Sequence, residues 1–411
     1  MKMKKFFSLV VMAMFALSSL ATAASVLDGL KLSGEVTVNK VSVNNEATGS
    51  AATDDYRSES SVRTMINMDM QLADDMDARV VLTKNDQKFG DNNGNDQNLG
   101  NAQWATNVTN AYIKVQKLLD LIDLKVGRMF YGERNALSMY KGPSYDYNLG
   151  IVAVDGYLAT AEIAGINVEY LDAKEIEVGN AQDRDTDLQG LVLSPVSKIA
   201  DMVSGKFYAY KKVDNLAAGN HDSNTLLLYG IKASADVSGV NVKAEYAMNG
   251  GTDETGATDV DYKGNAMIVG ASAKVASVGV RAEIANGSGQ DTSSDNTLFT
   301  AESDLRYGEI WGNTTETAIL GGVGIANLSV VNVGADYDVN DKVKASADYL
   351  ILKRNELVAG TKKIGNEIDL KATYEHSENL SMELVVARLM TDKAFGTDDI
   401  DKVNLQMNFK F

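Results

Sequence analysis

The sequence has no cysteine, only 2 prolines and only 2 histidines. The lack of cysteine excludes a disulfide-stapled domain and the usual thiolate zinc sites. His221, Asp222 and Ser223 are the residue types of a nucleophilic triad, but they are consecutive, so their side chains diverge instead of converging on one point. We therefore expect neither an enzyme nor a bound cofactor.

The chain also lacks a second long apolar run. At its amino terminus, Lys2, Lys4 and Lys5 precede a mostly apolar stretch over 6–17 and the small residues 21–23, which predicts an export signal over 1–23. After this segment no run reaches the roughly 18 apolar residues of a membrane helix. The predicted mature chain, 24–411, is thus exported without a helical anchor.

Positive charge is scarce as well. Removing the signal takes away three lysines and no acidic residue, so 36 of the 39 basic residues remain against 56 acidic ones, a formal charge of −20. Such a chain is a poor partner for nucleic acid. With only Pro143 and Pro195 interrupting it and no linker in sight, we expect one continuous architecture over 24–411 instead of two or three globular domains.

The pattern that is present is alternation of apolar and polar residues. In 403–411 every second residue is apolar, from Val403 to Phe411, and the residues between them are polar. The segments 240–246 and 368–375 repeat the pattern. A strand sends successive side chains to opposite faces, so this period of two predicts strands with one apolar and one polar face.

Counting such segments predicts an all-β protein, a transmembrane antiparallel β-barrel of about 18 strands. Sixteen is the next choice, because the strands on either side of Pro195 are the weakest. The expected strands are 28–44, 57–73, 77–89, 107–117, 120–131, 149–161, 165–173, 185–195, 203–213, 223–237, 240–249, 262–275, 278–287, 325–339, 342–354, 365–376, 380–390 and 399–411.

The connections support a barrel of the bacterial outer membrane. Short links alternate with long loops rich in Gly, Asn, Asp, Ser and Thr, as periplasmic turns and external loops do. Tyrosines then fall near the external rim, and Tyr337, Tyr374 and Phe411 near the periplasmic rim. A water-soluble β-sandwich also has alternating strands, but it gives no reason for this loop pattern.

A barrel of 16 to 18 strands is wide enough to leave an aqueous channel. The polar row is expected to line it with charges of both signs that either select solutes or pair with one another and keep the wall wet. The predicted lining residues are Arg63, Lys114, Asp123, Lys125, Lys243, Glu245, Arg281, Glu283, Lys344, Asp348, Asp369 and Lys371.

These features predict a passive diffusion channel for small hydrophilic solutes or ions. The alternative is an outer-membrane anchor or adhesin with a plugged lumen, whose longest loop, 288–324, binds a partner. Acidic loops could bind divalent cations that bridge lipopolysaccharide, but solvated loop charge is the favoured interpretation. The sequence is compatible with both a monomer and a homo-oligomer.

The segment 91–102 has a calcium-loop spacing, but Asp96 and Ala102 stand where Gly and Glu are required, so no metal site is expected.

One short motif carries a family resemblance. The segment 127–134, Gly-Arg-Met-Phe-Tyr-Gly-Glu-Arg, resembles the alginate-export-type outer-membrane porins, which are 18-stranded barrels. The resemblance implies that Arg128 lines the pore and faces an anionic saccharide. Strict alternation instead places Arg128 with Leu124 and Val126 on the lipid-facing row, unless a bulge at Gly127 turns it inward.

Overall fold

In the computed structural model, the described residues are 29–45, 56–88, 106–144, 149–177, 185–199, 202–215, 223–256, 258–291, 294–311, 324–358, 361–395 and 398–411. The predicted signal segment, His221 and the segment 91–102 lie outside them. This part of the chain contains no helix that is long and apolar enough to cross a membrane.

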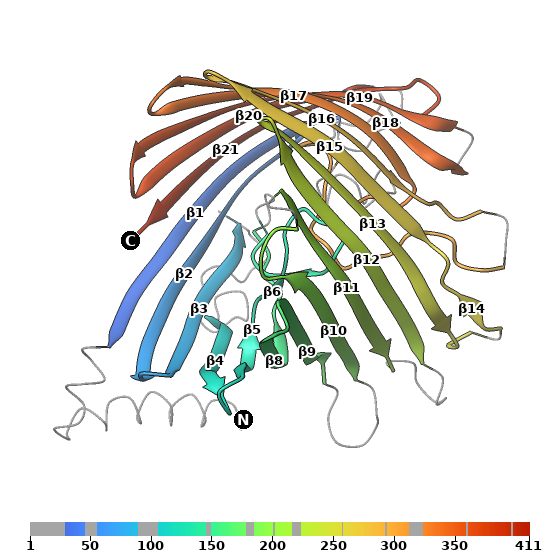
Figure 1. The fold of residues 1–411 in the computed structure, drawn as a ribbon. Coiled ribbons are helices and arrows are strands. Elements are labelled where there is room, and N and C mark those ends of the chain that lie inside the picture. The colour runs from blue at the N-terminus through green and yellow to red at the C-terminus, as the bar shows by residue number, and fades with distance from the viewer. Residues whose placement is uncertain are drawn as a thin grey trace, which may run out of the picture.

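Long antiparallel strands form one closed sheet (Figure 1). The main sheet has 19 strands, and without the two-residue β14 (Val260–Asp261) it has the 18 that were predicted. They are β1 Leu30–Asn44, β2 Arg57–Ala73, β3 Met76–Lys88, β4 Asn107–Leu118, β5 Ile122–Met129, β8 Val154–Ile163, β9 Ile166–Ile176, β10 Thr186–Pro195, β11 Val203–Asp214, β12 Asn224–Val237, β13 Val240–Asp253, β15 Asn265–Val275, β16 Val278–Gly287, β17 Leu328–Asn340, β18 Val343–Val358, β19 Thr361–Ser377, β20 Leu380–Thr391 and β21 Ile400–Lys410.

The first and last strands close the barrel. β1 pairs with β21 from Glu35 opposite Lys410 to Asn44 opposite Asp401, and the backbones of Gly34 and Phe411 exchange hydrogen bonds of 2.9 and 3.0 Å. A Cβ atom on Gly34 would lie 2.5 Å from the Phe411 ring, so only glycine fits at this point of the seam. Closure pairs both edges of the sheet, which leaves no open edge in the membrane.

The alternating sequence pattern becomes two faces of the wall. On β13 the outward Val242 and Tyr246 are 40% and 41% exposed, whereas the inward Glu245 and Asn249 are 5% and 4% exposed. The outward face therefore suits lipid, and it carries exposed tyrosines near both ends of the strands. Pro195 is tolerated because it is the last residue of β10, where the hydrogen-bonded ladder ends.

The buried apolar residues lie inside the lumen, because segments between strands fold inward and pack on the wall. Leu137 and Ile310 are fully buried and Phe299 is 2% exposed, in one cluster with wall residues such as Leu352 and Leu389. The two-stranded hairpin of β6 (Tyr131–Gly132) and β7 (Tyr140–Lys141) belongs to one of these inward segments. The predicted strand 149–161 accordingly begins only at Val154, since the residues before it continue that segment.

Candidate functional site: a constricted lumen

Two connections enter the barrel and meet there. Segment A is residues 130–144 and 149–153, between β5 and β8, and segment B is residues 288–291 and 294–311, which follow β16. The amide of Tyr140 donates to the carbonyl of Glu302 at 2.8 Å, and Asp304 accepts from the Arg134 guanidinium at 2.7 Å and from the amide of Asn135 at 2.8 Å. The two segments therefore form a joint structure that narrows the lumen.

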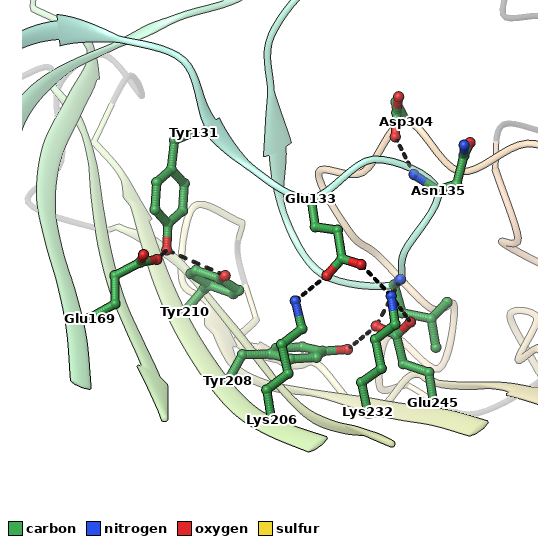
Figure 2. Close-up of polar contacts among 11 residues, drawn as sticks. Tyr131, Glu133, Asn135, Glu169, Lys206, Tyr208, Tyr210, Lys232, Glu245 and Asp304 are labelled. Carbon is green, nitrogen blue, oxygen red and sulfur yellow. Dashed lines mark hydrogen bonds and ion pairs between the residues drawn. The ribbon is translucent and has the colours of Figure 1, made fainter. Parts of the chain in front are cut away.

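Segment A is fastened to the wall of β11–β13 (Figure 2). Glu133 pairs with Lys206, and at 2.5 Å with Lys232, on two neighbouring strands. Beside them, Glu245 accepts hydrogen bonds from the amide of Leu137 at 3.0 Å and from the Tyr208 hydroxyl at 2.9 Å. Both carboxylates thus connect the segment to the strands through charge-assisted contacts.

Tyrosine side chains make a second contact between segment A and the wall, next to Glu133. The Tyr131 hydroxyl donates to Glu169 at 2.9 Å, and the ring of Tyr131 lies edge-on to that of Tyr210 at 6.2 Å between centroids (Figure 2). This contact adds apolar burial to the polar fastening.

The far end of segment A reaches β2. The fully buried guanidinium of Arg63 donates to the carbonyl of Ser144 at 2.5 Å and to Glu35 on β1 at 3.0 Å. Segment A therefore spans the lumen from β13 to β2. A predicted lining residue, Arg63, holds its end.

Segment B begins its crossing on β13 and β11. The amide group of Asn249 donates to the carbonyl of Thr300 at 2.7 Å and accepts from its N–H at 2.8 Å. Glu302 then pairs with Lys212 of β11 and with Lys141 of segment A. One carboxylate thereby joins both segments to the wall.

The end of segment B is anchored on β19. The fully buried Glu367 accepts hydrogen bonds from the amides of Ile310 at 2.7 Å and Trp311 at 3.1 Å, and the neighbouring Asp369 accepts from the amide of Glu309 at 3.1 Å. Two wall carboxylates thus satisfy three consecutive backbone donors. The Glu309 side chain is 3.3 Å from Lys371.

The carboxylates of the two segments are held ionised. Burial opposes ionisation of Glu302, but Lys141 and Lys212 outweigh it and lower its pKa to about 2. Burial likewise opposes ionisation of Glu133, and Lys206 and Lys232 bring its pKa below the usual value. The constriction therefore contains fixed ion pairs at neutral pH.

The predicted lining residues other than Arg128 lie on the inward row. Several pair with each other: Lys243 with Glu283 at 2.5 Å, Arg281 with Asp348 at 2.5 Å, and Lys114 with Asp123 at 3.2 Å. Lys125 lies over the Tyr112 ring, 4.8 Å from its centroid. Lys344 makes no ion pair with any residue that the structure describes, and it lines a groove of ≈ 320 Å³ with Lys274 and Ser346. Their contact with a solute stays a prediction.

Arg128 is the exception, and its predicted position in the pore is wrong. The register of β5 with β8 runs without a shift from Val126 opposite Tyr157 to Arg128 opposite Asp155, so no bulge reverses the alternation. Arg128 shares the outward face with Val126 and forms a bidentate pair with Asp155 at 2.6 and 2.9 Å.

The predicted residues Arg63, Glu245 and Asp369 hold segments A and B, but sequence reasoning missed other residues that build the constriction. Lys206 and Lys212 lie on the inward row of the predicted strand 203–213, so alternation alone could have identified them. Glu133 and Glu302 lie in connections with no repeating pattern, and no sequence signal marks them. Among the described residues no cluster of three or more acidic or histidine side chains forms a metal site.

With the fold and the lumen described, comparisons with known proteins identify the family. A family model described as Gram-negative porin matches residues 8–394. The chain belongs to the Gram-negative porin family. Its place is therefore the bacterial outer membrane, where lipid surrounds the barrel and small solutes pass through it. Members of this family are channels. A separate search of curated proteins found no match to the chain.

Solved structures share the fold of this porin at low identity. OpdQ of Pseudomonas aeruginosa is 12% identical, with a TM-score of 0.61 over 94% of this chain and 98% of that one. The outer membrane protein OpdK of the same organism is 11% identical, with a TM-score of 0.59 over 93% and 99%. A BenF-like porin from Pseudomonas fluorescens Pf-5 is 11% identical, with a TM-score of 0.60 over 93% and 98%.

The resemblance to alginate-export porins is not supported by these comparisons. The matching family model is the broader Gram-negative porin family, and the similar structures reported above are Opd and BenF-like proteins. Arg128, which carried the resemblance, faces away from the lumen.

Proposed function

We propose that this porin is a passive diffusion channel for small hydrophilic solutes and ions, with its passage set by segments A and B. The observation that carries the proposal is the inward row of charged residues, crossed by two segments that are fastened to it by ion pairs. Because these groups are charged and hydrogen-bonded, the remaining space is suited to water and polar solutes instead of apolar ones.

Paired charges also bear on selectivity. Lys206, Lys212 and Lys232 of β11 and β12 each have a carboxylate partner in segment A or B, so the constriction offers little net charge of either sign. We therefore expect weak ion selectivity. An anionic saccharide is the narrower substrate class within this proposal, and its carboxylates would compete with Glu133 and Glu302 for these three lysines.

Planar bilayer recordings test the proposal. The purified barrel should give discrete conductance steps, and in a KCl gradient its reversal potential should lie near zero. Added glucuronate should reduce the ion current more than equimolar glucose if anionic saccharides enter the lumen. Correctly inserted barrels that give no steps would contradict a diffusion channel.

An anchor or adhesin with a plugged lumen is the second candidate. The observation that favours it is the crossing of the lumen by both segments. The described part of the loop that was expected to bind a partner, however, folds inward as segment B. Wild-type barrels without conductance, together with conductance after Glu367→Ala, would favour the plugged lumen over the open channel.

A further inference from the structure

The inward face of the wall has two zones. Next to the long connections, the end that faces the exterior in bacterial barrels, inward residues such as Ala247, Ala285 and Leu352 are fully buried in the apolar cluster. We call this zone the external half. Towards the other end, inward side chains such as those of Lys243 and Lys274 are 47% and 63% exposed. A polar solute therefore meets its main barrier in the external half.

One stretch of wall in the external half is polar. Asn39 on β1 lies in register with Gln406 on β21 and with Ser61 on β2, three neighbouring strands (Figure 1). Thr37 and Asn404 extend this row along β1 and β21. All five side chains are uncharged, and they are between 0% and 9% exposed. We call these five residues the polar strip.

Three side chains of the polar strip have buried atoms without a hydrogen-bond partner in the described part of the chain. They are the hydroxyl of Thr37, Nδ2 and Oδ1 of Asn39, and Oδ1 of Asn404. Buried polar atoms are nearly always paired, so such a group of atoms calls for a ligand. Single atoms of this kind occur elsewhere on the wall, each on a different strand, at Asn110, Thr186, Asn332 and Asp369.

The polar strip lies between the ends of segments A and B. Arg63, which holds the end of segment A, is opposite Thr37 in register. Lys402, which donates to the Glu309 carbonyl of segment B at 2.5 Å, is two residues from Asn404 along β21. The two segments are thus fastened on either side of the polar strip and not by its unpartnered atoms.

Other polar groups of the external half hold the segments. Glu367 on β19 accepts from the amides of Ile310 and Trp311. Asn249 on β13 exchanges two hydrogen bonds with Thr300. A solute that passes along β13 or β19 must break such contacts. Along the polar strip a solute must displace what covers the wall, but it breaks no hydrogen bond of the unpartnered atoms and supplies new ones.

We propose that small sugars cross the external half along the polar strip, with their hydroxyl groups hydrogen-bonded to Thr37, Asn39 and Asn404. This inference rests on the proposed diffusion channel and specifies its route. Amide and hydroxyl side chains together offer donors and acceptors, as sugar hydroxyls do, and they carry no charge that would pair with an ion. The hydroxyl groups are therefore the part of a sugar that the polar strip recognises.

Cysteine substitution tests the route, because the chain has no cysteine of its own. In planar bilayers, the impermeant thiol reagent sulfonatoethyl methanethiosulfonate should react with Asn39→Cys. The attached group should lower single-channel conductance by about half or more, since it narrows the passage. The matched control is Ala285→Cys, which faces the lumen on β16 and is as buried as Asn39, 0% against 1% exposed. The reagent should leave its conductance unchanged.

The double variant N39L/N404L tests the role of the amides. It replaces unpartnered polar groups by apolar ones of similar shape, so the barrel should be at least as stable to urea as the wild type. Glucose uptake in liposome swelling should nevertheless fall about tenfold, the effect of losing two hydrogen bonds of ordinary strength. The control N167L/N241L removes two inward amides from the periplasmic ends of β9 and β13 and should leave uptake unchanged.

Two failures can be told apart. Wild-type barrels that insert but give no conductance steps would contradict the diffusion channel itself. Conducting barrels in which Asn39→Cys is unaffected by the reagent, or in which Ala285→Cys is blocked equally, would overturn only the route. Glucose uptake that is unchanged in N39L/N404L, or lowered equally in N167L/N241L, would also overturn it.

Discussion

Single carboxylates decide how the lumen is narrowed. Glu133 and Glu302 each contact two lysines, and each fastens a connection to the wall. Glu245 instead belongs to the wall, and it accepts a hydrogen bond from the amide of Leu137 in segment A. These contacts are charge-assisted and only partly exposed to water, so single substitutions should have measurable effects on the channel.

The acid response of the channel should follow Glu302. Its pKa is lowered from 4.5 to about 2, so its ion pairs with Lys141 and Lys212 are present above pH 4.5 and are lost only as the pH falls towards 2. We expect single-channel conductance at constant ionic strength to stay nearly constant from pH 7 to pH 3 and to rise below it. Glu302→Gln should show the raised conductance already at pH 7. A conductance change centred near pH 4.5 in the wild type would contradict this assignment.

Arg63 should contribute to stability through its buried contacts. Arg63→Ala removes the buried guanidinium that contacts Glu35 and the Ser144 carbonyl. Breaking such a buried ion pair should lower the free energy of unfolding by about 3 kcal/mol. The matched control is Arg79→Ala on the same face. Arg79 is 41% exposed beside Asp69, and its loss should cost about 1 kcal/mol or less. Urea unfolding of the reconstituted barrel measures the free energy of unfolding of both variants. Equal losses of stability in Arg63→Ala and Arg79→Ala would contradict the expected difference.

At the scale of elements, segments A and B determine the shape of the passage more than any strand does. The strands form a regular wall, whereas segments A and B have backbone N–H groups that need hydrogen-bond acceptors on that wall. Segment B illustrates this, because the amides of Ile310 and Trp311 both depend on the Glu367 carboxylate.

Glu367→Ala should release the end of segment B. Two buried amides then lose their acceptor, each at a cost of about 1 to 3 kcal/mol, so the segment should leave the wall. We expect single-channel conductance to rise roughly twofold with larger current fluctuations. Glu383→Gln is the control, since Glu383 faces the lumen on β20 and its one ion pair with a described residue is to Lys371, at 3.6 Å. The idea fails if both variants conduct like the wild type.

At the scale of the whole molecule, closure depends on one glycine. Gly34 lies where β1, β2 and the carboxyl terminus meet, with Met65 and Phe411 both 2.5 Å from the position of a Cβ atom. The seam between β1 and β21 is the last pairing that turns the open sheet into a barrel.

Gly34→Val should therefore prevent closure and greatly reduce the amount of folded barrel in the outer membrane. Heat-modifiable migration on gels distinguishes folded from unfolded protein. Gly205→Ala serves as the control, because its Cβ would have only one neighbour within 4 Å, the Lys232 carbonyl at 3.4 Å. Folded barrel at wild-type amounts in Gly34→Val would show that the seam can adapt.

Much of the wall was predictable from the sequence. Alternation placed Glu245 and Asp369 on the inward row and gave strand ends close to those of the structure, since a side-chain period of two is a local property of extended chain. The same rule had also placed Arg128 outward, correctly and against the family resemblance. The connections were not predictable, because no local pattern marks Glu133 or Glu302.

The sequence by itself determined an exposed apolar face, a polar inner face and the number of strands, because each follows from short-range alternation and from turn-forming residues. Only the tertiary structure decided which groups meet across the lumen. Glu302 pairs with Lys212 although 90 residues separate them, and Arg63 meets Ser144 across 81. Such contacts depend on barrel closure, which brings distant strands around one interior and gives buried backbone groups of segments A and B their partners.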